Sequence, residues 1–304
     1  MADPPMSEHL GQLFAAARAT LQPLLPKRLR GDIPVVPVVR LSGVIGFSTP
    51  LRPGLTLAHV ARPLERAFAM RRARAVALVI NSPGGSPVQS HLIYCRIREL
   101  AAAHGRRVIA FAEDLAASGG YMIACAADEI ICDPHSIVGS IGVVGGSFGF
   151  AKLMEKVGIE RRLYTSGEHK AMLDPFLPEN PQDVERLKTV QREIHEGFIS
   201  LVKQSRGTRL NGPEKTLFSG EYWSGSKAVE FGLADGIGDL RTTLRTRFGD
   251  DVVTPLVAPA RGWFGRLQPG VGTTDLAGLP RAADFAEEVI SALEARALWA
   301  RYGL

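Results

Sequence analysis

The sequence is poor in cysteine and contains no long apolar run, and each absence excludes a class of protein. Its three cysteines, Cys95, Cys125 and Cys132, are an odd number, and no two have the Cys-x-x-Cys spacing of a metal or redox site. We therefore expect no disulfide framework and no metal site. No run approaches the roughly 18 apolar residues of a membrane-spanning helix, so we expect no transmembrane segment.

Charge of one sign is not concentrated anywhere in the chain. There are 36 Lys and Arg residues against 31 Asp and Glu, and the basic residues are scattered without interleaved aromatic residues. This pattern argues against nucleic acid as a partner. Residues 139–146 are rich in glycine but lack the spacing of a phosphate-binding loop, so we expect no nucleotide and no other cofactor.

The first 33 residues form an appendage rather than a targeting signal. Their acidic start lacks the positive-then-apolar order of a signal peptide. Apolar residues at helical spacing between Leu10 and Leu21 predict an amphipathic helix that packs on protein, with membrane contact as the less favoured alternative. We therefore expect a cytoplasmic protein that is at most peripheral at a membrane.

The rest of the chain divides into three parts. Residues 34–248 form one α/β domain, and residues 249–280 are a linker rich in proline and glycine. Residues 281–304 then predict an amphipathic helix. Docking on a subunit surface is its favoured role, and the alternative is that its apolar tail reaches a substrate groove of an oligomer.

Apolar runs alternate with helical patterns through the central domain. The runs are uninterrupted by polar residues, which is typical of parallel strands covered on both faces by helices. We expect strands at 35–41, 75–80, 107–112, 129–132 and 161–165, and helices at 56–70, 88–103, 121–127, 150–157 and 181–202.

Ser118 stands between a predicted strand and a predicted helix, followed by Gly119 and Gly120. Backbone N–H groups at such a helix start are unpaired, which suits a nucleophile whose reaction builds an oxyanion. The alternative is that Ser118 only caps the helix, and these residues taken alone favour the cap.

A second motif, Asn81-Ser82-Pro83-Gly84-Gly85, directly follows another predicted strand. Pro83 restricts the turn, and the glycines allow backbone N–H groups to approach a ligand without obstruction from a Cβ atom. Two such donors aimed at one point make an oxyanion hole. Taken alone, the motif favours a plain strand-to-helix turn.

These two motifs together resemble the Clp-protease/crotonase superfamily, and more of the chain resembles its signal peptide peptidase A family of bacterial serine peptidases. The other matching segments occur in order at 38–43, 126–130, 139–143, 166–170 and 220–235. The resemblance implies an α/β fold of repeated ββα units with a parallel sheet covered by helices. It also implies a peptide substrate and a homo-oligomer whose active sites are shared between subunits.

The resemblance assigns roles to particular residues. It implies Ser118 as the nucleophile and Lys170 as the general base, with the lysine supplied by a neighbouring subunit. The oxyanion hole would comprise Gly85 and Gly119, and the substrate would lie against Gly84, Gly142, Val143 and Val144. Small apolar side chains would be favoured near the cleaved bond.

Three alternatives stay open. A lysine acts as a base only when neutral, which requires its pKa to fall from about 10.4, so His135 is a competing base. A glycine oxyanion hole also suits a non-proteolytic acyl-transfer or acyl-CoA enzyme. The third alternative is a catalytically inactive oligomeric scaffold.

Overall fold

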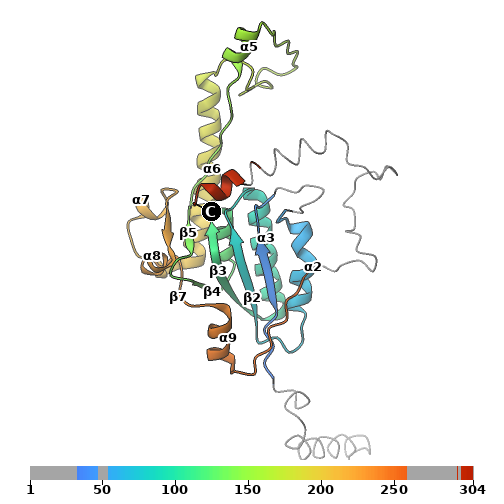
Figure 1. The fold of residues 1–304 in the computed structure, drawn as a ribbon, viewed down its shortest axis with the longest axis vertical. Helices are drawn as coiled ribbons and strands as arrows, with labels where there is room; N and C mark the ends of the chain where they lie inside the picture. Colours follow the sequence, from blue (N-terminus) through green and yellow to red (C-terminus); the bar gives the residue numbers. More distant parts are fainter. Residues whose placement is uncertain (1–32, 47–53, 259–292, 294–295, 304) are drawn as a thin grey trace, which may run out of the picture.

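A parallel sheet forms the centre of the molecule in the computed structural model, which describes residues 33–46, 54–258, 293 and 296–303. The predicted N-terminal helix lies outside these residues, as do residues 259–280 of the predicted linker. Strands lie side by side in the order β1, β2, β3, β4, β7 (Figure 1). Their bounds are Val38–Ser42, Ala75–Ser82, Arg107–Ala117, Glu129–Cys132 and Gly236–Ile237.

Helices cover both faces of this sheet, as the sequence predicts. Side chains of β2 alternate between the two cores: Val76, Leu78 and Ile80 face one, and Ala75, Ala77 and Val79 face the other. The first core is closed by α2 (Leu57–Phe68), α3 (Pro87–His104) and α4 (Gly119–Ala124), and the second by α9 (Leu240–Phe248). Burial of both faces explains why the strand sequences are apolar without alternation.

Strand β3 changes its partner halfway along. Its first half pairs with β4 at residues 109–112, and its second half pairs with β5 (Ile137–Gly139) at residues 115–117. The Ser136 hydroxyl donates to the carbonyl groups of Ala112 and Glu113 where the exchange occurs. The strand therefore continues past its predicted end at residue 112 and ends directly before Ser118.

Short elements complete the body. Strand β6 (Tyr222–Ser224) runs antiparallel to β5. In the sequence it is preceded by η2 (Gly207–Arg209) and α7 (Glu214–Leu217) and followed by α8 (Gly225–Glu230). Residues 253–257 run beside β1, with the N–H groups of Val36 and Val38 donating to Val253 and Pro255. This part of the predicted linker 249–280 is therefore attached to the sheet edge.

An arm, residues 142–197, projects from the body (Figure 1). It contains α5 (Ala151–Val157) and most of α6 (Pro181–Arg206). The strand predicted at 161–165 is wrong, because these residues are exposed and have no strand partner to satisfy their backbone groups. Phe150 stacks on Phe176 near the far end, yet no residue of the arm is buried.

The arm is anchored to the body at the last turn of α6. Arg206, whose side chain is 0% exposed, donates from both terminal nitrogens to the carboxylate of Asp235 at 2.8 Å. Ser205 donates to the carbonyl of Cys125 at the end of α4. Burial alone would raise the pKa of Asp235, but hydrogen bonds from Arg206 and the Ile130 N–H outweigh it and hold that pKa below its ordinary value.

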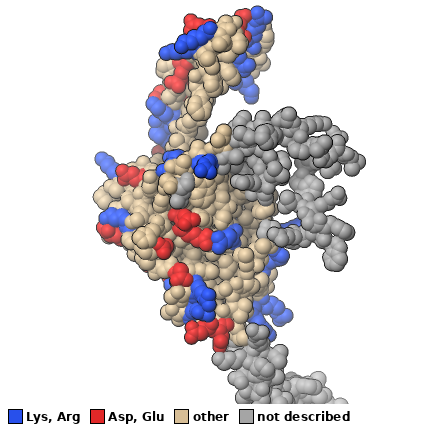
Figure 2. Space-filling view, in the orientation of Figure 1, with Lys and Arg blue, Asp and Glu red and all other residues tan. Residues whose placement is uncertain are grey.

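Helix α6 has 26 residues, and at about 1.5 Å per residue it is long enough to cross a bilayer. Its exposed face carries charges such as Glu185, Arg186 and Lys188, however. Within the described ranges, no helix is both long and apolar enough to span a membrane. Figure 2 shows that acidic and basic side chains are interspersed over the arm and over the face of the body in view.

Replacing Asp235 by Asn should destabilise the protein, because the buried Arg206 guanidinium then loses its counter-ion. We expect a loss of about 3–5 kcal/mol in urea unfolding near pH 7. The matched control is Glu230→Gln, which breaks the exposed Lys227–Glu230 pair and should cost under about 0.5 kcal/mol.

The same pair predicts a pH dependence. A carboxylate whose pKa is lowered by folding stabilises the protein above its unfolded pKa, about 3.9 for Asp. This contribution disappears as the pH falls through the lowered folded value. The gap in stability between wild type and Asp235→Asn should therefore narrow below about pH 4, and a gap that stays constant down to about pH 2 would contradict the assignment.

Candidate active site

Ser118 occupies the turn that joins β3 to α4. Its backbone has φ 53° and ψ −121°, its N–H donates to the Gly139 carbonyl at 2.8 Å, and its carbonyl accepts from Met122. The side chain makes no capping hydrogen bond to α4. The alternative role as a simple helix cap is therefore wrong.

The turn at Ser118 is strained. A positive φ is uncommon for a residue other than glycine and costs on the order of 1–3 kcal/mol. Such strain persists only where surrounding contacts determine it, and here the β5 carbonyl of Gly139 holds the turn from one side. A sharp strand-to-helix turn presents a half-buried serine hydroxyl at the end of a sheet, as a nucleophile requires.

The loop after β2 packs directly against this turn. Gly84 and Gly85 have φ of 101° and 140°, which disfavours other residues. A Cβ on Gly84 would lie 2.8 Å from that of Ser118, and one on Gly85 would collide with the Ile45 carbonyl. Ile45 also holds both sides of the loop. Its N–H donates to the Gly84 carbonyl, and its carbonyl accepts from the Ser86 N–H. The loop is therefore fixed beside Ser118.

Two backbone donors remain available at this point. The Gly84 N–H donates to the Ser82 hydroxyl at 3.2 Å, so it is already used. The N–H groups of Gly85 and Gly119 donate to no acceptor in the described part of the chain, and Gly119 is the first residue of α4. These are the two donors that the sequence predicts for an oxyanion hole.

Asn81 is a positioning residue that the sequence prediction missed. Its side-chain carbonyl accepts from the Leu115 N–H at 3.2 Å, and its amide donates to Asp114 at 2.7 Å. It thereby connects β2 to β3 where the register between these strands shifts, at Ile80 and Ser82. Its place directly before Ser82-Pro83-Gly84-Gly85 was the only sequence signal.

Lys170 is exposed and belongs to the segment between α5 and α6. Figure 1 shows this segment at the outer end of the arm, away from β3. No hydrogen bond or ion pair within the described residues connects it to the body. His135, the alternative base, is exposed in the turn between β4 and β5, and its backbone N–H donates to Asp133.

The segment predicted to bind substrate leaves β5 toward the arm. Gly142 and Val143 are half-buried, Val144 is 69% exposed, and none of the three belongs to a helix or strand. His195 of α6 contacts the Ile141 carbonyl through Nε2 at 3.0 Å, which supports the start of the segment. Its backbone is thus open to pair with an extended chain.

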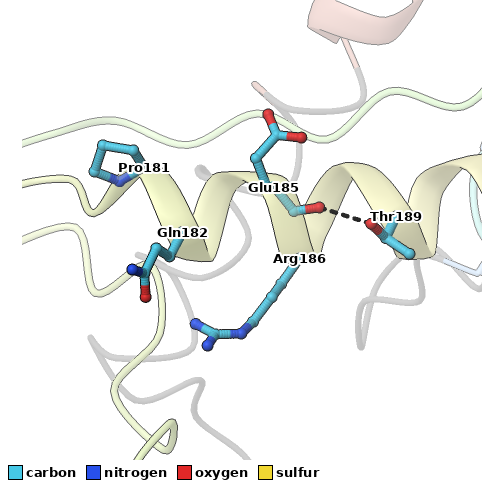
Figure 3. Close-up of a pocket in the computed structure, with 5 residues that line it drawn as sticks. All are labelled: Pro181, Gln182, Glu185, Arg186 and Thr189. Carbon is cyan, nitrogen blue, oxygen red and sulfur yellow. Dashed lines mark hydrogen bonds between the residues drawn. The ribbon is translucent and has the colours of Figure 1, made fainter.

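A hollow on the arm lacks this chemistry. It has a volume of about 450 Å³ and lies along the first turns of α6, and Figure 3 shows that its five lining residues, Pro181, Gln182, Glu185, Arg186 and Thr189, all come from that helix. Thr189 donates to the Glu185 carbonyl within the same helix. We therefore identify the active-site candidate by the Ser118 geometry and not by cavity size.

Comparisons with known proteins indicate a peptidase. Residues 101–248 match the model of Peptidase family S49. The chain is 29% identical over 218 residues to "Serine protease SPPA, chloroplastic" of Arabidopsis thaliana, covering 70% of this chain and 32% of that protein. It is 37% identical over 134 residues to "Probable protease SohB" of Buchnera aphidicola, covering 44% of this chain and 39% of that protein.

One relative has the name of a transporter and not of a protease. The chain is 53% identical over 287 residues to a protein of Brucella abortus named "Na(+)/H(+) antiporter NhaA", covering 93% of this chain. It spans only 39% of that protein's length, so most of the antiporter-named protein lies outside the match. The family match and the Ser118 turn lie within the shared part, and residues 101–248 of this chain belong to peptidase family S49, the signal peptide peptidase A family.

Proposed function

We propose that this chain is a serine endopeptidase that hydrolyses peptides through Ser118 and Lys170. The observation that carries the proposal is the strained Ser118 turn, where the Gly119 N–H and the Gly85 N–H of the adjacent glycine loop donate to no acceptor within the described residues. Family membership supports a serine-type peptidase in general, and the pairing with Lys170 is the finer assignment.

The geometry supports the following steps. The Ser118 Oγ attacks the peptide carbonyl carbon while a neutral Lys170 takes its proton. The carbonyl oxygen becomes an oxyanion that accepts hydrogen bonds from the N–H groups of Gly85 and Gly119. The C–N bond then breaks, the lysine returns the proton to the leaving amine, and water hydrolyses the acyl-enzyme by the same route.

The lysine must come from a neighbouring copy. Lys170 is exposed at the end of the arm, whereas a base has to lie within hydrogen-bond reach of the nucleophile. A lysine also becomes a competent base when it is desolvated, and the single chain does not bury this one. Contact with the body of a second copy meets both requirements.

The surface of the arm supports such an assembly. Large apolar side chains that are more than a third exposed occur along its whole length, among them Phe148, Leu153, Ile159, Tyr164 and Val190. Apolar surface on this scale marks an interaction site. The arm therefore fits a homo-oligomer in which each arm packs on a neighbour.

A peptide substrate fits the segment after β5. An extended chain that pairs with residues 142–144 would gain backbone hydrogen bonds, and glycine there offers no side chain to obstruct it. We propose released peptides or unfolded segments in the cytoplasm as substrates, with contact at a membrane surface as the less favoured alternative.

Mixing two inactive variants tests the shared site. Ser118→Ala and Lys170→Ala should each cleave a fluorogenic peptide at background rate when assayed alone. If serine and lysine come from different copies, co-refolding the two variants in equal amounts should restore about a quarter of the sites.

The control for mixing is the double variant Ser118→Ala/Lys170→Ala combined with Ser118→Ala, which restores no site under any arrangement. If the mixture of the two single variants stayed inactive and activity returned only when wild-type subunits were added, the serine and the lysine would act within one chain. Full activity of Lys170→Ala alone would remove the lysine from the mechanism and favour His135.

Substituting Gly85 by Ala tests the oxyanion hole. The added methyl group collides with the Ile45 carbonyl and moves the Gly85 N–H, so we expect kcat to fall about 100- to 1,000-fold with a smaller change in KM. Gly105→Ala is the matched control, since Gly105 also has a positive φ but open space around it. Equal losses of activity in the two variants would assign the effect to backbone strain alone.

A further inference from the structure

Ser82 is a buried polar residue to which the proposed mechanism gives no role. It is the last residue of β2 and is 0% exposed. Its hydroxyl donates to the Gly43 carbonyl at 2.7 Å and accepts from the Gly84 N–H at 3.2 Å. One hydroxyl thus connects the segment after β1 to the glycine loop after β2.

The turn after β3 also contacts Ser82. A Cβ atom on Gly120 would lie 2.6 Å from the Ser82 carbonyl oxygen, so the Gly120 backbone packs directly on this residue. In the sheet, Ser82 pairs with Ala116, two residues before Ser118. Ser82 therefore lies where the segments that follow β1, β2 and β3 meet.

The hydrogen bonds of the glycine loop determine which of its N–H groups is left for a substrate. The Gly84 carbonyl accepts from the Ile45 N–H at 2.8 Å. The Gly84–Gly85 peptide is trans, so this carbonyl and the Gly85 N–H point in opposite directions. The Gly85 N–H therefore points away from Ile45, whereas the Gly84 N–H is directed at the Ser82 hydroxyl.

Ser82 holds Gly84 on both sides. It accepts from the Gly84 N–H, and through the Gly43 carbonyl it holds the segment whose Ile45 N–H binds the Gly84 carbonyl. Glycine adopts many backbone conformations, and a buried N–H without an acceptor is unfavourable. Without the hydroxyl, the peptide that carries the Gly84 N–H would rotate toward another acceptor and move the adjoining Gly85 N–H.

We propose that Ser82 is a positioning residue of the oxyanion hole, and that its hydroxyl sets the direction of the Gly85 N–H. The inference rests on the proposed peptidase function and names what determines one of its two donors. A hydroxyl suits this place because it donates and accepts at once, whereas alanine does neither and cysteine does both only weakly.

Steady-state kinetics with a fluorogenic peptide test this role. The oxyanion forms only in the reaction, so a misdirected donor should affect kcat and not KM. For Ser82→Ala we expect kcat to fall about 10- to 100-fold while KM changes less than about twofold. Ser82→Cys keeps a weak donor and acceptor and should lose less activity than Ser82→Ala.

Tyr121→Phe is the matched control. The Tyr121 side chain is also 0% exposed, and its hydroxyl donates to the Leu233 carbonyl at 2.8 Å, outside the glycine loop. Its removal should lower the thermal stability, as Ser82→Ala does, but leave kcat unchanged. An equal loss of kcat in the two variants, a wild-type kcat in Ser82→Ala, or a loss confined to KM would overturn the positioning role.

Amide hydrogen exchange, resolved at Gly84 by fragmentation in a mass spectrometer, tests the inference without catalysis. Ser82→Ala should exchange the Gly84 N–H about tenfold faster than the wild type, the effect of one lost hydrogen bond, and Tyr121→Phe should not. Absent peptidase activity in the wild type would refute the proposed function and leave this measurement to decide. Unchanged exchange at Gly84 in Ser82→Ala would then show that the hydroxyl does not fix the loop.

Discussion

The hydrogen bond from the Ser118 N–H to the Gly139 carbonyl is the contact on which the active site depends. It ties the turn after β3 to the end of β5, and so holds Ser118 at a φ that the residue would otherwise avoid. The exchange of β3 from β4 to β5 makes this contact possible, since β5 is the strand that reaches residue 117. Gly84 then packs against the same turn from the β2 side.

In the proposed mechanism, one chain supplies only part of each active site. The body would supply the nucleophile and two N–H donors, and Lys170 belongs to the arm. The buried Arg206–Asp235 pair anchors the arm, because Asp235 also accepts from the Ile130 N–H of β4 and so connects the last turn of α6 to the sheet. An anchored arm with exposed apolar side chains is suited to bring its lysine to a neighbour.

Sequence patterns predicted the body better than the arm. Continuous apolar runs specify buried parallel strands whatever their partners, so β1 to β4 and the helices between them could be predicted. The exchange of partners along β3 could not, because it depends on contacts with residues 136–139, and β3 was therefore predicted too short. Both helices of the arm were predicted, but the arm buries no residue, so the segment between α5 and α6 lacks a core-facing pattern and a strand was wrongly predicted at 161–165. Ser118, Gly85 and Gly119 stood out through glycine and proline patterns, whereas the supporting role of Asn81 depends on a strand register that local sequence does not encode.

The central claim is that Ser118 is an activated nucleophile, and reaction with a serine-directed phosphonate followed by peptide mapping in a mass spectrometer tests it most directly. We predict one adduct, on the peptide that contains Ser118, formed by the assembled protein and lost on unfolding. An acyl-CoA enzyme or an inactive scaffold needs no activated serine. Assembled protein that stays unmodified, or carries its adduct on another serine, would contradict the account.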